Sequence, residues 1–181
     1  MVKVISFLWG FLEATIFFIV PDVYLTGVVL RAGLKKIWVP LFYCLAGAIF
    51  GGALIYYFAL IYPSTTLDWL DYVPGISEKL IQEVRVGISV DGLISMFGGM
   101  FQGTPYKLFA AVWGERRGEL FPFLLLSLVA RGLRFAVSII ITVFLGALGV
   151  KFFKDWNRWK WILYSIFWLT FYIFYFNYYK W

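Results

Sequence analysis

Histidine is absent from this sequence of 181 residues, and cysteine occurs once, as Cys44. The lack of histidine excludes a histidine base and a histidine zinc site, and a single thiolate cannot hold a structural metal on its own. One cysteine also excludes an intrachain disulfide. No nucleophile stands beside a base or a metal motif elsewhere in the chain. We therefore predict no catalytic residue, no metal and no cofactor, and a protein that is not an enzyme.

Charged residues are also scarce. They make up 14% of the chain, whereas 62% is hydrophobic and the mean hydropathy is +0.84. Soluble domains are typically about 45–50% apolar, so the composition predicts an all-α polytopic membrane protein. The net charge of +6 comes from short basic loops beside apolar segments, and nucleic acid is therefore not an expected partner.

Three apolar segments are long enough to cross a hydrocarbon core about 30 Å thick. They span residues 37–62, 120–150 and 161–179. Gly47 and Gly51 in the first segment form the small-residue pattern that lets another helix approach closely. The third segment follows a basic loop, Lys151 to Lys160, and is rich in aromatic residues, which is typical of lipid-facing and interfacial helices.

Two further apolar segments are interrupted in their middle. They span residues 4–30 and 92–114. Pro21 breaks the first, and the run from Gly103 to Pro105 breaks the second. A broken helix leaves backbone groups unpaired, which is tolerated at membrane depth only where protein or water lines the break. We predict two re-entrant helical hairpins with tips at Pro21, Gly103 and Pro105. For the second segment, a kinked span whose Lys107 reaches outward stays an alternative.

The stretch 63–91 is the only long polar part of the sequence, and we expect it to lie outside the bilayer as a loop. Within it, apolar side chains recur at helical spacing and charged ones occupy the opposite face. The apolar positions are Leu80, Ile81, Val84 and Ile88. This pattern favours an amphipathic helix in the membrane interface.

The distribution of basic residues predicts the orientation of the chain. A hairpin makes no net crossing, so eight lysines and arginines fall on the face of the N-terminus and five on the other. By the positive-inside rule the N-terminus is cytoplasmic. The same counting predicts an inverted repeat, with halves at about 4–62 and 92–149 joined by 63–91. Residues 151–181 follow as a basic loop and a C-terminal aromatic membrane helix.

Five ionisable residues lie inside the apolar segments: Glu13, Asp22, Lys107, Arg131 and Arg134. Each costs roughly 2.5–3.5 kcal/mol at a helix centre, so we expect pairing or solvation. The acids belong to the first hairpin and the cations to the second half, which predicts a charged cavity where the halves meet. Three cations against two anions favour a phosphate-bearing ligand, because arginine grips phosphate with two donors.

In this hypothesis Lys107, Arg131 and Arg134 bind the substrate, and Glu13 and Asp22 serve as counter-charges that could also carry protons. Lys107 follows the break at Gly103 to Pro105, so it falls in the first turn of the returning helix, where free N–H groups favour an anion. The alternative is a membrane scaffold or assembly protein, in which the same charges are structural salt bridges.

Several pieces of the sequence together resemble a known family. They are Glu13, Pro21-Asp22, Gly47 to Gly52 with Tyr56, Gly103-Thr104-Pro105-Tyr106-Lys107 with Gly114, and Arg131-Gly132-Leu133-Arg134-Phe135. Over about residues 5–149 the chain resembles the bacterial DedA membrane proteins, most of all the YqaA-like branch of the superfamily that includes the eukaryotic VTT-domain (SNARE-associated) proteins. It differs at Ile19, where members usually carry a second proline, and by lacking the arginine that classical members carry near Gly103.

The resemblance implies two opposed re-entrant hairpins in a multi-pass protein of the inner (cytoplasmic) membrane. It also implies a flippase or scramblase that moves undecaprenyl phosphate or a phospholipid across the bilayer, and activity that depends on the membrane glutamate, aspartate and arginine positions. The expected partners are therefore membrane lipids, with protons as a second ligand if transport is coupled. A homo-oligomer is left open.

Overall fold

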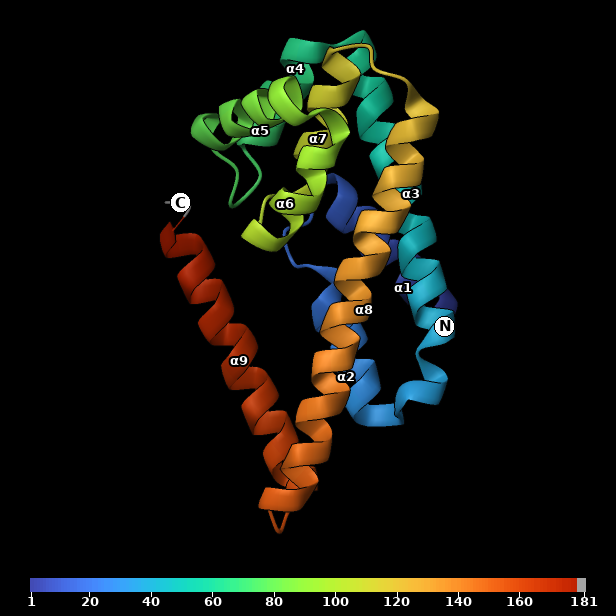
Figure 1. The fold of residues 1–181 in the computed structure, drawn as a ribbon, viewed down its shortest axis with the longest axis vertical. Coiled ribbons are helices and arrows are strands. Elements are labelled where there is room, and N and C mark those ends of the chain that lie inside the picture. Colours follow the sequence, from blue (N-terminus) through green and yellow to red (C-terminus); the bar gives the residue numbers. More distant parts are fainter. Residues whose placement is uncertain (179–181) are drawn as a thin grey trace.

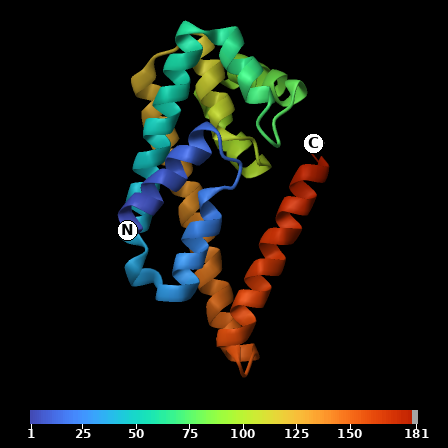
Figure 2. The same cartoon turned by 180° about the vertical axis from the view of Figure 1, so that it is seen from behind.

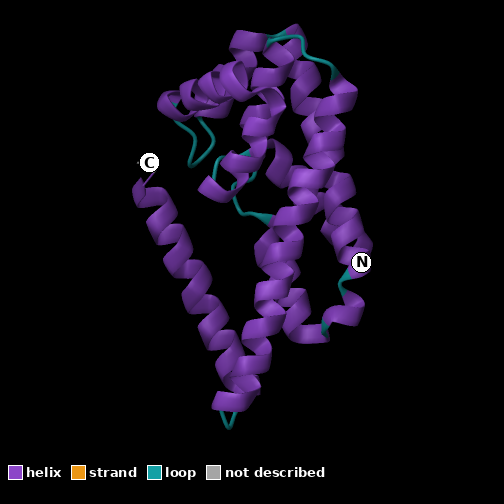
Figure 3. Cartoon of the chain, viewed as in Figure 1, coloured by secondary structure: helices purple, strands orange, loops and turns teal. Residues whose placement is uncertain are grey.

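The computed structural model describes residues 1–178, apart from the side chain of Met100. Within these residues the protein consists of helices and short loops, with no strand (Figures 1 and 3). The α-helices are α1 (Val2–Thr15), α2 (Pro21–Ala32), α3 (Trp38–Ile61), α4 (Pro63–Asp71), α5 (Glu78–Asp91), α6 (Ser95–Gln102), α7 (Tyr106–Glu115), α8 (Leu120–Phe152) and α9 (Trp156–Tyr178). Short 3-10 turns, η1 (Leu34–Lys36) and η2 (Gly92–Ile94), precede α3 and α6. The all-α prediction is confirmed.

The first interrupted segment forms the helices α1 and α2, separated by the irregular stretch 16–20. Pro21 opens α2, where its fixed φ suits a helix and its missing N–H costs nothing. Val20 is extended, as expected of a residue before proline. The break near Pro21 is thus confirmed, but it lies before the proline rather than at it.

The second interrupted segment forms α6 and α7. Gly103 ends α6 with φ 87°, a left-handed conformation that favours glycine, and the N–H of Thr104 donates to the carbonyl of Gly99 at 2.9 Å. Pro105 precedes the first residue of α7. The break predicted from Gly103 to Pro105 is confirmed.

Two of the described helices, α3 and α8, are long and apolar enough to cross a membrane. The 33 residues of α8 extend over about 50 Å. Only 17% of its most apolar window is buried, which is unlike the core helix of a soluble protein. The third predicted crossing, in α9, is not among the two, since Trp and Tyr contribute little to hydropathy. Its last predicted residue, Tyr179, lies outside the described residues.

Glycines allow a very close contact between α1 and α3. A Cβ on Gly10 would collide with the carbonyl of Cys44, and one on Gly47 with the carbonyl of Phe7. One on Gly51 would lie 2.8 Å from the carbonyl oxygen of Phe11. The two backbones can touch only because these side chains are absent, as the spacing of Gly47 and Gly51 predicts.

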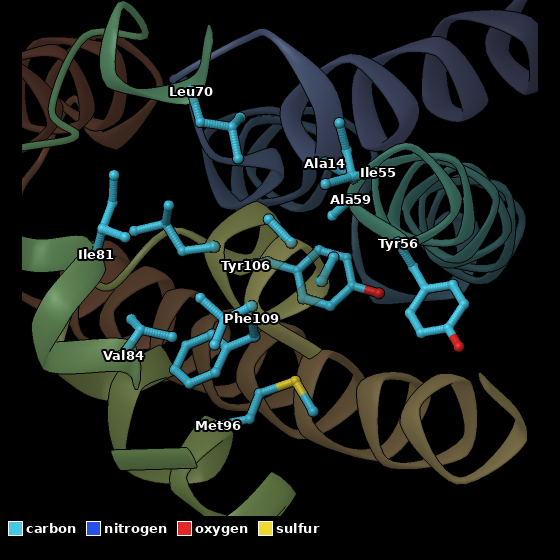
Figure 4. Packing of buried hydrophobic residues seen from close by; sticks show 14 of the residues in the cluster. Ala14, Ile55, Tyr56, Ala59, Leu70, Ile81, Val84, Met96, Tyr106 and Phe109 are labelled. Carbon is cyan, nitrogen blue, oxygen red and sulfur yellow. The ribbon is translucent and has the colours of Figure 1, made fainter. Parts of the chain in front are cut away.

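The buried core gathers around α7, which is enclosed by α3, α5 and α8 (Figure 4). Tyr106 stacks on Phe123, with ring centroids 5.8 Å apart, and Phe123 stacks on Tyr56 at 6.2 Å. In a second, smaller core, Leu25 and Val29 of α2 pack with Phe135 of α8. The returning helix of each broken pair therefore packs on the long helix that follows the other pair.

The polar stretch 63–91 is more ordered than a loop, since it forms α4 and α5. Ser77 caps α5 by accepting a hydrogen bond from the N–H of Leu80 at 3.4 Å. The predicted amphipathic helix is confirmed, but its apolar side chains are buried in the main core beside α7. The prediction that this face lies in the membrane interface is therefore wrong.

The C-terminal part departs from prediction in its connection. Because α8 continues to Phe152 and α9 begins at Trp156, most of the basic loop predicted from Lys151 to Lys160 is helical. From this turn α9 runs back along the molecule, apart from the main body (Figures 1 and 2). None of its described residues is buried.

Candidate functional site

The five charged residues of the apolar segments come together where the two helix breaks meet the middle of α8. Glu13 lies in the last turn of α1, Asp22 in the first turn of α2 and Lys107 in the first turn of α7. Arg131 and Arg134 share one face of α8, as their spacing of three residues predicts. The acids of the first segment therefore face the cations of the second half.

Arg131 and Glu13 form an ion pair through Nη2 and Oε2, with each side chain only 7% exposed. The guanidinium also lies over two aromatic rings, 4.6 Å from the centroid of Tyr106 and 5.4 Å from that of Phe135. Its Nε has no hydrogen-bond partner among the described residues. This pair is sealed, and separating it would leave an uncompensated buried charge.

Arg134 and Asp22 form the second pair, with Nη2 3.1 Å from Oδ2. Ser138 donates a hydrogen bond to Oδ1 of the same carboxylate at 2.6 Å. Asp22 also lies at the N-terminus of α2, where the helix dipole favours a negative charge. The Asp22 side chain is 3% exposed, but that of Arg134 is 22% exposed. Arg134 is thus the most accessible of the five charged residues.

Lys107 joins the two breaks. Its Nζ donates a hydrogen bond to the carbonyl of Phe17 at 2.6 Å, and the residue is 1% exposed. The carbonyl belongs to the irregular stretch between α1 and α2, so it has no partner within a helix. The outward-reaching alternative for Lys107 does not fit this geometry, because the ammonium points into the protein.

Other side chains partner a further part of this stretch and the first turn of α2. Trp9 donates from its indole nitrogen to the carbonyl of Ile19 at 3.1 Å. The N–H of Val20 donates to the hydroxyl of Tyr172 on α9 at 2.9 Å, and the hydroxyl of Tyr164 donates to the carbonyl of Val23. Irregular backbone partnered by protein in this way is the kind that membrane depth tolerates.

Two spaces adjoin the charges. A cavity of about 30 Å³ is lined by Glu13, Lys107 and Arg134 and closed by rings of α9, and it has room and polar partners for water. A groove of about 480 Å³ lies on the other side of Arg134, between α6, α8 and α9, and it also touches Asp22 and Ser138. Its volume lies within the range of small-molecule sites, and Arg134 borders both spaces.

The sequence predicts the five charges but not the residues that complete the site. Ser138 is four residues after Arg134, a spacing that places both on one helix face and could have drawn attention to it. Tyr164 and Tyr172 carry no such signal, because 12 of the last 21 residues are aromatic. No group of His, Cys, Asp and Glu suited to a metal occurs within residues 1–178.

The sequence matches no model of a known protein family, and comparisons with curated proteins and with solved structures found no match.

Proposed function

We propose that this protein is a DedA-type multi-pass membrane protein that moves a phosphate-headed lipid, such as undecaprenyl phosphate or a phospholipid, across the bilayer. The observation that carries the proposal is the position of Arg134. Its guanidinium pairs with a buried carboxylate on one side and borders an open groove on the other. A lipid phosphate in that groove would contact a guanidinium that already lies level with the helix breaks.

The chemistry of the exchange supports this role. A phosphate crossing hydrocarbon needs its charge compensated along the way, whereas its tails can stay in the bilayer. Arg134 pairs with Oδ2 of Asp22 by charge, but that oxygen accepts no hydrogen bond among the described residues. A phosphate gripped by the guanidinium would therefore add charge-assisted hydrogen bonds that the ion pair does not supply. Asp22 keeps Ser138 and the N-terminus of α2 as partners during the exchange. Arg131 and Lys107 add positive charge behind Arg134.

Glu13 is the proposed proton carrier of this cycle. It lines the small cavity beside Lys107, and its charge holds Arg131. A proton taken up by Glu13 would remove the negative charge opposite Arg131, so a phosphate beside Arg134 would meet a larger net positive charge. Glu13→Gln should therefore make lipid movement less dependent on pH, as measured in liposomes across a range of pH values. An unchanged pH profile would remove Glu13 from this role.

The proposal includes the membrane arrangement. The pairs α1–α2 and α6–α7 are re-entrant hairpins entering from opposite faces, α3, α8 and α9 cross the bilayer, and the N-terminus is cytoplasmic. The chemistry of the stretch 16–20 supports this, since side chains partner the carbonyls of Phe17 and Ile19 and the N–H of Val20. Accessibility labelling of cysteines introduced at Arg31 and Arg116 tests the arrangement, and finding both on one side would contradict it.

Reconstitution tests the function itself. Purified protein in liposomes should speed the movement of labelled phosphate-headed lipids between leaflets, compared with protein-free liposomes. Lys107→Ala, Arg131→Ala and Arg134→Ala should each slow this movement, provided that the variants insert and purify like the parent protein. If all three moved the lipids at the parent rate, the assignment of these residues would be wrong.

A second candidate, a membrane scaffold, is favoured by one observation: each of the three cations already has a partner within the chain. The two functions predict different results for the exchange of Glu13→Arg with Arg131→Glu. A scaffold should keep its abundance and its function, because the ion pair is preserved in reverse. A lipid transporter should keep its abundance and lose transport, because the charge facing the phosphate is inverted.

A further inference from the structure

The groove at Arg134 continues along α8 and α9. A second depression of about 430 Å³ lies between the same two helices, and it shares Ser138, Phe167 and Trp168 with the groove described above. Together they extend from Arg134 to Lys160, near the turn that joins α8 to α9. On α8 the lining residues include Arg134 and Gly149, which are 15 residues apart, so the combined groove follows this helix for about 22 Å.

The wall formed by α8 carries a line of polar side chains. Arg134, Ser138 and Thr142 follow one another at four-residue spacing, so they lie on one helix face, and all three line the groove. Gly146 takes the next position, and a Cβ there would meet no atom within 4 Å. A basic residue lies at each end of the groove, Arg134 of α8 deep in the protein and Lys160 of α9 at the far rim.

The opposite wall is apolar and aromatic, and it is weakly attached. Phe167 and Trp168 of α9 face the groove, and the described part of α9 has no buried residue. The hydroxyls of Tyr164 and Tyr172 hold this helix to α2 and to the residue before it. The α8 wall thus offers the charge of Arg134 and two hydroxyl groups, which at present donate to Asp22 and to the carbonyl of Ser138, so that a phosphate would have to replace these acceptors. The other wall offers a surface for a hydrocarbon chain.

We propose that the groove between α8 and α9 is the route by which the lipid reaches Arg134, with its phosphate along the polar line of α8 and its chain against α9. This inference rests on the proposed transport function and names its path. The occupant follows from charge complementarity, because an anionic headgroup finds a cation at both ends. The larger depression beside α1, α3 and α4, about 500 Å³, has no charged lining residue and offers a phosphate no such partner.

A matched pair of glycine variants tests the route. Gly146 and Gly132 both lie within α8, and a Cβ at either meets no atom within 4 Å, but Gly146 lines the groove and Gly132 does not. In liposomes, Gly146→Phe should slow the movement of a labelled phosphate lipid about tenfold, whereas Gly132→Phe should change it less than about twofold. Gly146→Leu serves as the smaller obstruction if the phenylalanine variant does not fold.

The polar line has its own variant. Thr142→Val keeps the shape of the side chain and removes its hydroxyl, and it should slow transport about threefold while Thr142→Ser restores the parent rate. A phosphate lipid with a photoreactive group on its chain provides a direct measurement. Its label should map to the peptide that contains Phe167 and Trp168, and labelling confined to the peptide that contains Leu54 and Phe58 would overturn the route.

The outcomes separate the route from the function. If Arg134→Ala stops transport while Gly146→Phe and Gly146→Leu leave it at the parent rate, the route is wrong and the proposed function stands. If the parent protein moves no phosphate lipid in liposomes, the proposed function fails and the route fails with it.

Discussion

The two broken helix pairs have the same order of helices but differ in which helix is held most tightly. It is the first, or outgoing, helix in the first pair and the second, or returning, helix in the second pair. In the first pair the outgoing helix, α1, contacts α3 backbone to backbone through glycines, and the returning helix, α2, packs on α8. In the second pair the returning helix, α7, is buried over most of its length. The outgoing helix, α6, has eight residues and lies at the edge of the core. One pair supplies acids and the other a lysine.

Packing and charges both join the two halves, although each pair is held through a different helix. Each returning helix packs on the long helix of the other half, as an inverted repeat would produce. The acids of the first pair reach α8, and Lys107 of the second pair reaches the break of the first. The halves exchange both apolar and polar contacts at one level of the molecule.

The largest expected effect concerns the glycines that hold α1. Gly47→Leu should prevent folding, because the side chain would have to displace the backbone of α1, and we expect a loss of at least about 3 kcal/mol. Gly98→Leu in α6 is the matched control, since a Cβ there meets no atom within 4 Å, and it should cost less than about 1 kcal/mol. The yield of monodisperse protein in detergent and its thermal unfolding measure both. Equal losses would show that the outgoing helices do not differ as described.

The next largest effect should distinguish the two ion pairs that the acids of the first helix pair form, because their loss should cost different amounts of stability. Glu13→Ala leaves Arg131 buried without a partner, which should reduce stability by about 3–5 kcal/mol. Asp22→Ala leaves a guanidinium that is already 22% exposed and can turn toward the groove, so its cost should be smaller. Thermal unfolding of both variants provides the measurement. A larger loss for Asp22→Ala would contradict the distinction between a sealed pair and an accessible one.

Arg134→Ala should affect transport more than folding. It removes one charge-assisted contact to the phosphate, worth about 1.5–3 kcal/mol, which corresponds to a rate about 10- to 150-fold lower. Arg134→Lys keeps the charge but loses the two-donor guanidinium, so its transport rate should lie between those of Arg134→Ala and the parent protein. Liposome transport and thermal unfolding are measured on the same preparations. A variant that transports normally but unfolds early would assign Arg134 a structural role.

The smallest effect is expected at the ion pair between α5 and α7. Arg85 donates from Nε and Nη2 to Glu115 at 3.1 and 2.7 Å, and this hydrogen bonding raises the pKa of Arg85. Both side chains are roughly 30% exposed, so Arg85→Ala should cost about 1 kcal/mol or less and leave transport unchanged. A strong loss of transport would instead show that the functional site also includes this ion pair at the end of α7.

Much of the fold could be predicted because single residues determine it locally. Pro21, Gly103 and Pro105 interrupt helices through their backbone chemistry, and the length of the apolar segments predicts α3 and α8. The five charges stand out because apolar segments rarely contain any. The partners could not be predicted in the same way. Lys107 donates to a carbonyl, which every residue carries, so the sequence offers no signal for Phe17 as its acceptor.

The apolar face of α5 shows a second limit. Periodic apolar residues indicate that one face of a helix avoids water, but lipid and protein satisfy that requirement equally well. The choice between them depended on α7, which packs against α5 in the same buried core. Such pairing follows from the three-dimensional arrangement of helices that lie far apart in the sequence.

The hydrogen bond from Val20 to Tyr172 also has a consequence for biosynthesis. The two residues are 152 positions apart, so at about 5–20 residues per second a ribosome needs about 8–30 s to produce the acceptor after the donor. During that interval the N–H of Val20 lacks its final partner, and hydrocarbon offers none. If the first helix pair enters the membrane as proposed, it should therefore stay near water or beside the insertion machinery until the last helix has emerged.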